Sequence, residues 1–165
     1  MLACIDVDYR EEESVAACLL ICDWSDEVAF DEWVVHLPPA APYQPGMFYL
    51  RELPCLLAAL QRPKEPPSIV VIDSYVWLDG HGKPGLGAHL YEALGRRIPV
   101  IGVAKTAFAG SHFAVPVKRG RSQVPLYITA VGIPVDEAAV YIQRMHGAFR
   151  VPSILKRVDR LCREG

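Results

Sequence analysis

Apolar runs divide the first part of the chain into three expected strands, which are LACIDVDY (2–9), SVAACLLICDW (14–24) and EVAFDEWVVHL (27–37). The polar connections between them, REEE and SDE, are short enough for hairpins. The segment PPAAPYQPG then ends the pattern, because its four prolines and one glycine break regular structure. The N-terminal third is therefore predicted to form antiparallel strands.

Helical and apolar segments alternate through the rest of the chain. A helical pattern starts at Met47, and Pro54 is expected to end one short helix and open the next. Two short apolar runs predict strands buried on both faces, SIVVID (68–73) and IPVIGVA (98–104). The remaining expected elements are a helix over LGAHLYEALG (86–95), strands near 112–117 and 124–131, and helices over about 136–146 and 153–163.

This order predicts an α/β fold with a ribonuclease-H-like mixed sheet, in which three antiparallel strands are followed by parallel strands and flanked by helices. The length of 165 residues suits one domain over 1–165, and no internal repeat is visible. No apolar run is long enough to cross a membrane. Asp6 lies too early for a signal peptide, so a cytoplasmic location is expected.

Composition and charge narrow the chemistry only slightly. The five cysteines include no CxxC pair, which favours buried reduced thiols over a zinc site. The net charge is −2, yet VKRGR (117–121) and the tail KRVDRLCRE together carry seven basic residues. Two interpretations stay open, a basic rim around an acidic metal centre or two solvated surfaces, and charge alone favours the second.

Two aspartates interrupt buried strands. Asp6 lies between Ile5 and Val7, and Asp73 closes an apolar run. A charge in a buried strand is costly, and ligands of α/β sheets gather at the carboxyl ends of parallel strands. Both residues are therefore candidates for a site, with a turn-capping role as the alternative. Asp8, two residues after Asp6, is expected to be solvated.

Two helical acids border apolar stripes. Glu52 shares one side of its expected helix with Phe48 and Arg51, and a surface salt bridge is the alternative to a functional role. Asp159 stands at the edge of the last helix's stripe, with bases mostly outward. Carboxylates that converge from two strands and two helices suit Mg²⁺, with Mn²⁺ as an alternative ion. Such ions activate water and stabilise the leaving 3′ oxygen of a phosphodiester.

The stretch YQPGMFYLRE (43–52) resembles the Y-x-P-G-x-x-x-x-R-E signature of the endonuclease V family, also called deoxyinosine 3′-endonucleases. The resemblance extends over almost the whole chain. The signature and G-V-A-K are specific when they occur together. The other segments that resemble family motifs are IDVDY, VVID, GLGAHL, IGVAKT, PLYITAVG and FRVPSILKRVDRL.

The resemblance implies a Mg²⁺-dependent endonuclease that flips a deaminated base and cuts DNA or RNA one nucleotide to its 3′ side. On this basis Asp6, Glu52 and Asp73 would bind the metal, with Asp159 as a fourth acid, and Lys105 would face the scissile phosphate or the attacking water. The resemblance implies that the partner is a nucleic acid, that no membrane is involved, and that the protein is a monomer. Expected substrate-binding residues are Tyr43, Pro45 and Gly46 of a strand-separating wedge, with Arg51, His81, Gly82 and Gly85.

The chain departs from the family pattern around the base pocket. Asp73 is followed by SYVWL, and DGHG appears only at 79–82, so Asp79 is the alternative third acid. The strand end VVID favours Asp73. The usual H-P-R is absent, with His81 as its expected remnant, and His89 is either the family's helix histidine or a packed side chain. The chain therefore resembles a shortened member of the endonuclease V family.

Three functions are compatible with these residues. The first is a nuclease acting near inosine, the second is a non-catalytic nucleic-acid-binding relative, and the third is a ribonuclease-H-like nuclease with another substrate. The retained acids favour an enzyme over the binding relative. The wedge sequence YQPG favours inosine over other substrates. The choice between DNA and RNA stays open, because contacts to the 2′-hydroxyl come from loops.

Overall fold

The structure is a computed structural model that describes residues 1–42, 44–108 and 110–165. Within these residues one seven-stranded sheet has the order β3-β2-β1-β4-β5-β7-β6. The mixed, ribonuclease-H-like sheet confirms the predicted fold class, with antiparallel pairing among β1, β2 and β3 and parallel pairing of β1, β4 and β5. The strands are β1 (Leu2–Tyr9), β2 (Ser14–Ile21), β3 (Asp31–Leu37), β4 (Ile69–Ile72), β5 (Val100–Ala104), β6 (Val115–Val117) and β7 (Leu126–Val131).

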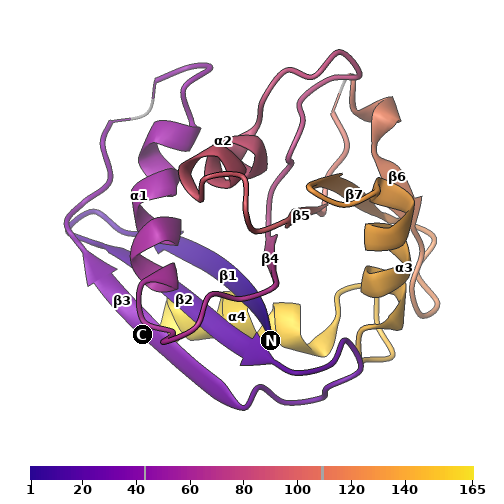
Figure 1. Cartoon of the computed structure of the whole chain (residues 1–165), viewed down its shortest axis with the longest axis horizontal. Helices are drawn as coiled ribbons and strands as arrows, with labels where there is room; N and C mark the ends of the chain where they lie inside the picture. The colour runs from indigo at the N-terminus through magenta and orange to yellow at the C-terminus, as the bar shows by residue number, and fades with distance from the viewer. Residues whose placement is uncertain (43, 109) are drawn as a thin grey trace.

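Helices cover both faces of the sheet (Figure 1). One face carries α1 (Tyr49–Leu60) and α2 (Leu86–Ala93), which contact each other. The other face carries α3 (Val135–Arg144) against β6 and β7 and α4 (Ser153–Glu164) against β1 and β2. A short 3₁₀ helix, Ser111–Phe113, precedes β6. Among the described residues, no helix is both long and apolar enough to span a membrane.

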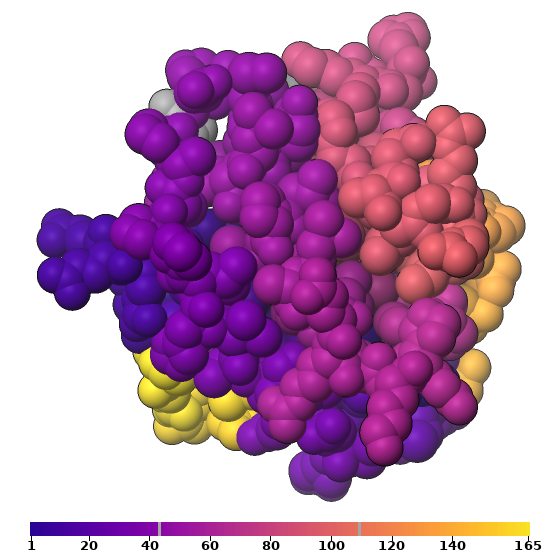
Figure 2. Space-filling view, turned by 60° about the vertical axis from the view of Figure 1, so that its left-hand side comes forward, coloured from indigo at the N-terminus to yellow at the C-terminus, as the bar shows by residue number. Residues whose placement is uncertain are grey.

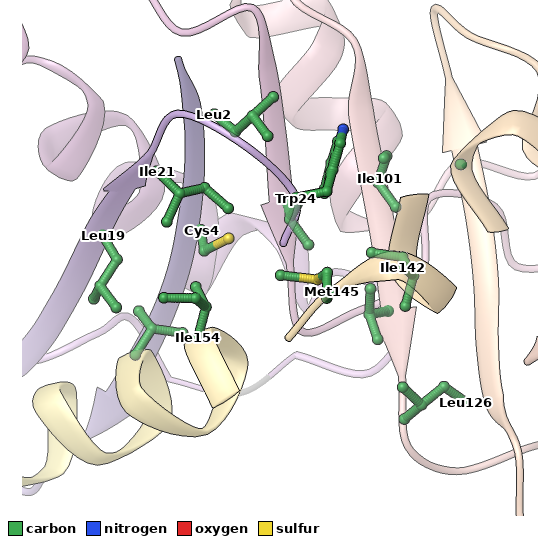
Figure 3. Close-up of a cluster of buried hydrophobic side chains, with 14 of the residues drawn as sticks. Leu2, Cys4, Leu19, Ile21, Trp24, Ile101, Leu126, Ile142, Met145 and Ile154 are labelled. Atoms are coloured by element: carbon green, nitrogen blue, oxygen red, sulfur yellow. The ribbon is translucent and has the colours of Figure 1, made fainter. Parts of the chain in front are cut away.

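The alternation of side chains along β1 determines to which face of the sheet Asp6 points. Leu2 and Cys4 enter the core beneath α3 and α4, whereas Ala3 and Ile5 enter the core beneath α1 and α2. Figure 3 shows Cys4 in the first of these cores, near Ile154 of α4. Because side chains of a strand alternate between faces, Asp6 continues the series of Leu2 and Cys4 at the end of the buried part of β1.

Three element boundaries differ from the sequence prediction. The helix α1 runs continuously through Pro54, so the predicted division into two helices is wrong. Pro54 and Leu50 are exposed, and water can serve the Leu50 carbonyl that lacks a helical partner. The second strand ends at Ile21 and the third begins at Asp31. The intervening loop is closed by the Asp26 carboxylate, which accepts hydrogen bonds from two loop amides.

The segment SYVWL after β4 is packed across β5. The Val76 amide donates to Thr129 Oγ1 over 2.8 Å, and Tyr75 and Val76 are buried. A Cβ on Gly102 of β5 would lie 2.4 Å from the Ser74 carbonyl oxygen, so only glycine permits this crossing. The segment SYVWL, in which the chain departs from the family sequence, is therefore held in place between the end of β4 and α2.

Candidate active site at the carboxyl edge of the sheet

Asp6 and Asp73 are neighbours at the carboxyl ends of two parallel strands. Ile5 of β1 is paired in register with Ile72 of β4, and each aspartate follows its isoleucine directly. Two pockets open at this edge, and Ile5, Asp6, Ile72 and Asp73 line both of them. The topology therefore creates the juxtaposition that the sequence predicted, because β1 and β4 are adjacent although they lie far apart in the chain.

The two pockets extend towards opposite faces of the sheet. The first, with about 270 Å³ of space, is lined also by Glu52 of α1, together with Leu56 and Leu86. The second, with about 310 Å³, reaches Lys105 and the α4 residues Leu155 and Val158. Glu52 thus joins the aspartates from one side and Lys105 from the other.

Negative charge accumulates around Asp6. Burial and the charges of Asp73 and Asp159 raise the pKa of Asp6 to about 7, although the Val7 amide, 2.8 Å from Asp6 Oδ1, and Lys105 oppose the rise. Burial likewise raises the pKa of Glu52 to about 7, with contributions from Asp6 and Asp73. Asp73 is paired with Lys105 over 2.5 Å. The Lys105 ammonium therefore faces Asp73 and Asp6, whereas Glu52 approaches the aspartates from the other face of the sheet. Asp6 and Glu52 both resist ionisation.

The donor set has the chemistry of a Mg²⁺ site that relies on the substrate for some of its ligands. No group of three or more His, Cys, Asp and Glu side chains in the described part of the chain converges tightly enough to hold an ion alone. Mg²⁺ usually keeps several waters and takes only one or two carboxylates together with substrate phosphates. The hard oxygens of Asp6 and Asp73, with unbalanced charge around them, fit that mode of binding.

The structure places the two other candidate acids differently. Asp159 of α4 accepts a hydrogen bond from Arg163 over 2.9 Å and contributes to the site through its charge on Asp6. Asp79 closes an exposed turn, in which its Oδ1 accepts the amides of His81 and Lys83. These hydrogen bonds lower the pKa of Asp79. Asp73 lines the two pockets with Asp6, and Asp79 does not.

The predicted wedge precedes α1 as a tight turn. The Met47 amide donates to the Gln44 carbonyl over 3.0 Å, and Gly46 has φ +77°. Pro45 followed by a glycine with positive φ is typical of a type II turn. Pro45 and Gly46 are exposed, whereas Tyr43 lies outside the described residues.

Arg51 and Glu52 both lie near Tyr9. The Arg51 guanidinium lies over the Tyr9 ring, 4.5 Å from its centroid, whereas Glu52 lines the pocket of the aspartates. Burial and the Glu52 charge raise the pKa of Tyr9. The adjacent charges of the signature thus both act on Tyr9, and Glu52 also lines the pocket of the aspartates.

A third pocket lies between the segments that precede α1 and α2. Figure 2 shows these segments, in purple and rose, facing each other across the upper edge of the molecule. Its lining includes Gly46 and Gly85, while His81 and Gly82 belong to the neighbouring exposed turn. A Cβ on Gly85 would lie 2.7 Å from the Tyr75 carbonyl oxygen. The full lining, with about 410 Å³ of space, is Gly46, Phe48, Tyr49, Ser74, Leu78, Pro84, Gly85 and Leu86.

His89 is a packed side chain of α2. Its ring is stacked on Tyr49 of α1 with a centroid distance of 3.5 Å and an interplanar angle of 16°. Burial lowers the pKa of His89, which favours the neutral imidazole. Of the two interpretations of His89, the contact with Tyr49 supports packing between α1 and α2.

Sequence reasoning missed two arginines that support Lys105. Arg150 donates to the Lys105 carbonyl and, over 2.9 Å, to the Pro125 carbonyl. Arg119 is only 4% exposed and donates to the carbonyls of the segment that carries Arg150. Its acceptors are the carbonyls of Met145, Gly147, Phe149 and Arg150. The motif FRVP contained Arg150, but nothing local in the sequence indicated its partners.

The raised pKa values predict that, without divalent cations, the protein is more stable in mild acid than in mild base. Asp6 and Glu52 have ordinary pKa values of 3.8 and 4.5 and folded values of about 7. The folded state therefore binds more protons between these limits, and the free energy of unfolding falls as pH rises from about 4 to about 7. Asp6→Asn removes one of the two groups, and it is expected to stabilise the protein at pH 8 by up to ~3 kcal/mol.

Urea denaturation of the unsubstituted chain and Asp6→Asn, at pH 5 and pH 8 with a chelator present, measures this difference. Asp79→Asn serves as a matched control, because the Asp79 carboxylate accepts two amide hydrogen bonds that lower its pKa and is not crowded by other acids. If the free energy of unfolding changes equally between pH 5 and pH 8 in the unsubstituted chain and in Asp6→Asn, the carboxylates around Asp6 do not repel one another as proposed.

Comparisons with known proteins relate almost the whole chain to one family. The family model described as Endonuclease V matches residues 1–143. The chain is 32% identical to the Endonuclease V of Streptomyces avermitilis, with 96% of this chain and 77% of that protein covered. It is 33% identical to the Endonuclease V of Thermococcus kodakarensis, with coverage of 96% and 76%.

Solved structures show the same fold. The crystal structure of the Streptomyces avermitilis Endonuclease V superposes with a TM-score of 0.76 at 24% identity, covering 99% of this chain and 79% of that chain. The Endonuclease V of Ciona intestinalis, in complex with a 24mer DNA that contains an inosine followed by a ribo-adenosine, has a TM-score of 0.78 at 17% identity. That likeness covers 99% of this chain and 84% of the other.

Proposed function

This chain belongs to the endonuclease V family, and from that membership we propose that it is a Mg²⁺-dependent endonuclease that cuts DNA or RNA to the 3′ side of a deaminated base such as inosine. The family assignment itself supports a nuclease that acts on nucleic acid. The observation that carries the finer proposal is the convergence of Asp6, Glu52 and Asp73 on one pocket at the carboxyl edge of the sheet.

In this proposal Asp6, Glu52 and Asp73 would hold the ion, with Mn²⁺ as an alternative to Mg²⁺. When bound, the ion activates water and stabilises the leaving 3′ oxygen. The raised pKa values of Asp6 and Glu52 support this role, because carboxylates that repel one another gain most from a cation. The charge of Asp159 strengthens the negative potential at Asp6 from the side of α4.

Lys105 would contact the scissile phosphate. Burial opposes the charge of Lys105, but the hydrogen bond and the charge of Asp73 outweigh it and raise the pKa of Lys105. The ammonium therefore keeps its proton and lies 2.5 Å from an acid of the site. A phosphate oxygen that approaches Asp6 and Asp73 meets a positive group already fixed beside them, which favours binding of the dianionic transition state.

The pocket between the segments before α1 and α2 would receive the flipped base. Gly46, which has nothing within 4 Å of its Cβ position, lets the backbone approach a planar ligand closely, and Leu78, Leu86 and Phe48 supply apolar walls. The DNA that contains inosine in the Ciona intestinalis structure supports a deaminated purine as the ligand of this pocket. The wedge of Tyr43, Pro45 and Gly46 and the turn of His81 and Gly82 flank it in the sequence.

The proposed unit is one nuclease domain over residues 1–165 that acts as a monomer. The sheet supports this extent, since it takes strands from Leu2 to Val131, and α4 packs against β1 and β2. The first strand and the last helix thus belong to the same domain. Both contribute acids near the site, Asp6 from β1 and Asp159 from α4.

Cleavage of end-labelled single-stranded DNA and RNA oligonucleotides, each with or without one inosine, tests the proposal. A cut one nucleotide 3′ of inosine is expected with Mg²⁺, and it should disappear with a chelator or in Glu52→Ala. The Glu52→Ala control removes one proposed ligand from a helix that otherwise stays packed through Cys55 and Leu56. Cleavage without inosine would support a nuclease with another substrate, and binding without cleavage would support the non-catalytic relative.

A further inference from the structure

An exposed phenylalanine lies beside an unpaired lysine near the end of the chain. Phe149, between α3 and α4, is 68% exposed, and Lys156 Nζ of α4 lies 4.3 Å from the centroid of its ring. The Phe149 ring therefore presents apolar surface to the solvent, with the Lys156 ammonium over the ring. A flat aromatic face next to a cation is a typical surface for an unpaired nucleic-acid base.

Two more basic residues, Lys118 and Arg121, belong to a loop that contacts the backbone at Phe149. The loop before β7 is fixed against the Phe149 backbone, since Arg119 donates to the Phe149 carbonyl over 2.8 Å. Gly120, with φ +59°, lies so close that a Cβ would be 2.2 Å from the Ala148 carbonyl oxygen. Lys118 and Arg121, on either side of this contact, are exposed. We call Lys118, Arg121, Phe149 and Lys156 the Phe149 surface.

The charge of the Phe149 surface is not balanced locally. None of Lys118, Arg121 and Lys156 has a carboxylate within 4.0 Å among the described residues, whereas the other bases of α4 are paired. The sequence also has no Asp or Glu between Glu92 and Asp136, or between Glu137 and Asp159. Lys118, Arg121 and Lys156 thus add positive charge near the acidic site, while Glu27 of the β2–β3 loop lies 4.0 Å from His146 of the segment that carries Phe149.

The Phe149 surface is continuous with the candidate active site. Arg150, the next residue, donates to the carbonyl of Lys105. Val151 and Leu155, on the same segment as Phe149 and Lys156, line the pocket that contains Asp6 and Lys105. The segment from Phe149 to Lys156 therefore connects the Phe149 surface with the pocket that contains Asp6 and Lys105.

We propose that the Phe149 surface binds the single-stranded part of the nucleic acid that leaves the active site, with one unpaired base stacked on Phe149 and phosphates on Lys118, Arg121 and Lys156. This proposal rests on the proposed nuclease function and extends it. It selects single-stranded substrates, because a base within a duplex offers no open face to Phe149. It also explains how a chain with a negative net charge binds a polyanion, since the contacts concentrate on one basic surface.

The test compares Phe149→Ala with Phe30→Ala. Phe30 is 57% exposed and lies in the loop between β2 and β3, at the opposite edge of the sheet from Asp6. Affinity is measured by fluorescence anisotropy on a labelled 20-nucleotide inosine-containing DNA with a chelator present, and cleavage kinetics are measured with Mg²⁺. Phe149→Ala is expected to weaken single-strand binding by about tenfold and to raise KM with little change in kcat, and Phe149→Trp should restore both.

The lysine is tested through the salt dependence of binding. Lys156→Ala should reduce the slope of log affinity against log salt by about 0.7, as expected for one lost phosphate contact on a single strand. Lys64→Ala, in the exposed loop between α1 and β4 at the far edge, should leave the slope unchanged.

The outcomes separate this proposal from the nuclease function. If the unsubstituted chain cleaves inosine-containing strands and Phe149→Ala binds and cleaves them equally well, the Phe149 surface is not a nucleic-acid site. Equal losses of Phe149→Ala on single strands and on a matched duplex would also overturn it, because a base within a duplex offers no open face that could stack on Phe149. If the unsubstituted chain neither binds nor cleaves, both the proposed function and this extension fail.

Discussion

Asp73→Asn is expected to lower the rate of cleavage by about a thousandfold or more while the protein stays folded. The substitution keeps the size of the side chain but removes a charged oxygen from both pockets of the site. Loss of a ligand that helps to stabilise transition-state charge costs several kcal/mol, and each ~1.4 kcal/mol is a factor of ten in rate. The measurement is single-turnover cleavage of the inosine-containing strand with Mg²⁺.

Stability should change little in Asp73→Asn. The pair of Asp73 and Lys105 is about one-third exposed on each side, and such pairs contribute little to folding. The substitution also relieves the charge that Asp73 exerts on Asp6 and Glu52. With a chelator present, the unfolding midpoint of Asp73→Asn is therefore expected within a few degrees of the unsubstituted protein.

Asp79→Asn is the matched control for Asp73→Asn. It should keep nearly full activity, because the Asp79 carboxylate serves an exposed turn through the amides of His81 and Lys83. An active Asp73→Asn together with an inactive Asp79→Asn would assign the third acid to Asp79. That result would require the turn of 79–83 to open and move to the carboxyl edge of the sheet during catalysis.

The acids of the site could be predicted because they violate local rules. A charge after Ile5 or after Ile72 is costly in a buried strand, and parallel strands bring their carboxyl ends to one edge. The in-register pairing of Ile5 and Ile72 then places the two aspartates side by side. The strands and their order along the chain were predicted from the same apolar runs. One pattern in the sequence therefore predicts both the fold and the acids of the site.

Other parts of the site depend on contacts that no local pattern contains. The stacking of His89 on Tyr49 joins two helices, and the sequence left its role open. The continuity of α1 depends on the exposure of Leu50 and Pro54, because water replaces the lost helical hydrogen bond. The position of Asp79 is fixed by a turn whose amides come from residues that follow it. In each case the deciding partner is a spatial neighbour or the solvent.

Arg119 is the strongest case of a residue whose role the sequence hides, and Arg119→Met is expected to destabilise the protein by about 4 kcal/mol. VKRGR reads as a solvated basic segment, yet Arg119 is buried and donates to four carbonyls of residues 145–150. Methionine fills a similar volume but donates no hydrogen bond, so these carbonyls lose their partner. Each buried acceptor left without a partner costs about 1–3 kcal/mol, and water recovers part of that cost.

Loss of Arg119 should also reduce activity beyond its effect on stability. The same segment carries Arg150, which holds the carbonyl of Lys105, so a displaced segment releases the ammonium that faces Asp73. Thermal unfolding should show a decrease in Tm of about 10 °C for Arg119→Met. Arg121→Met, two residues away and exposed, should keep the unsubstituted Tm. Equal Tm values for both variants would show that the four carbonyls find other donors, and the segment that carries Arg150 would then keep its contact with Lys105.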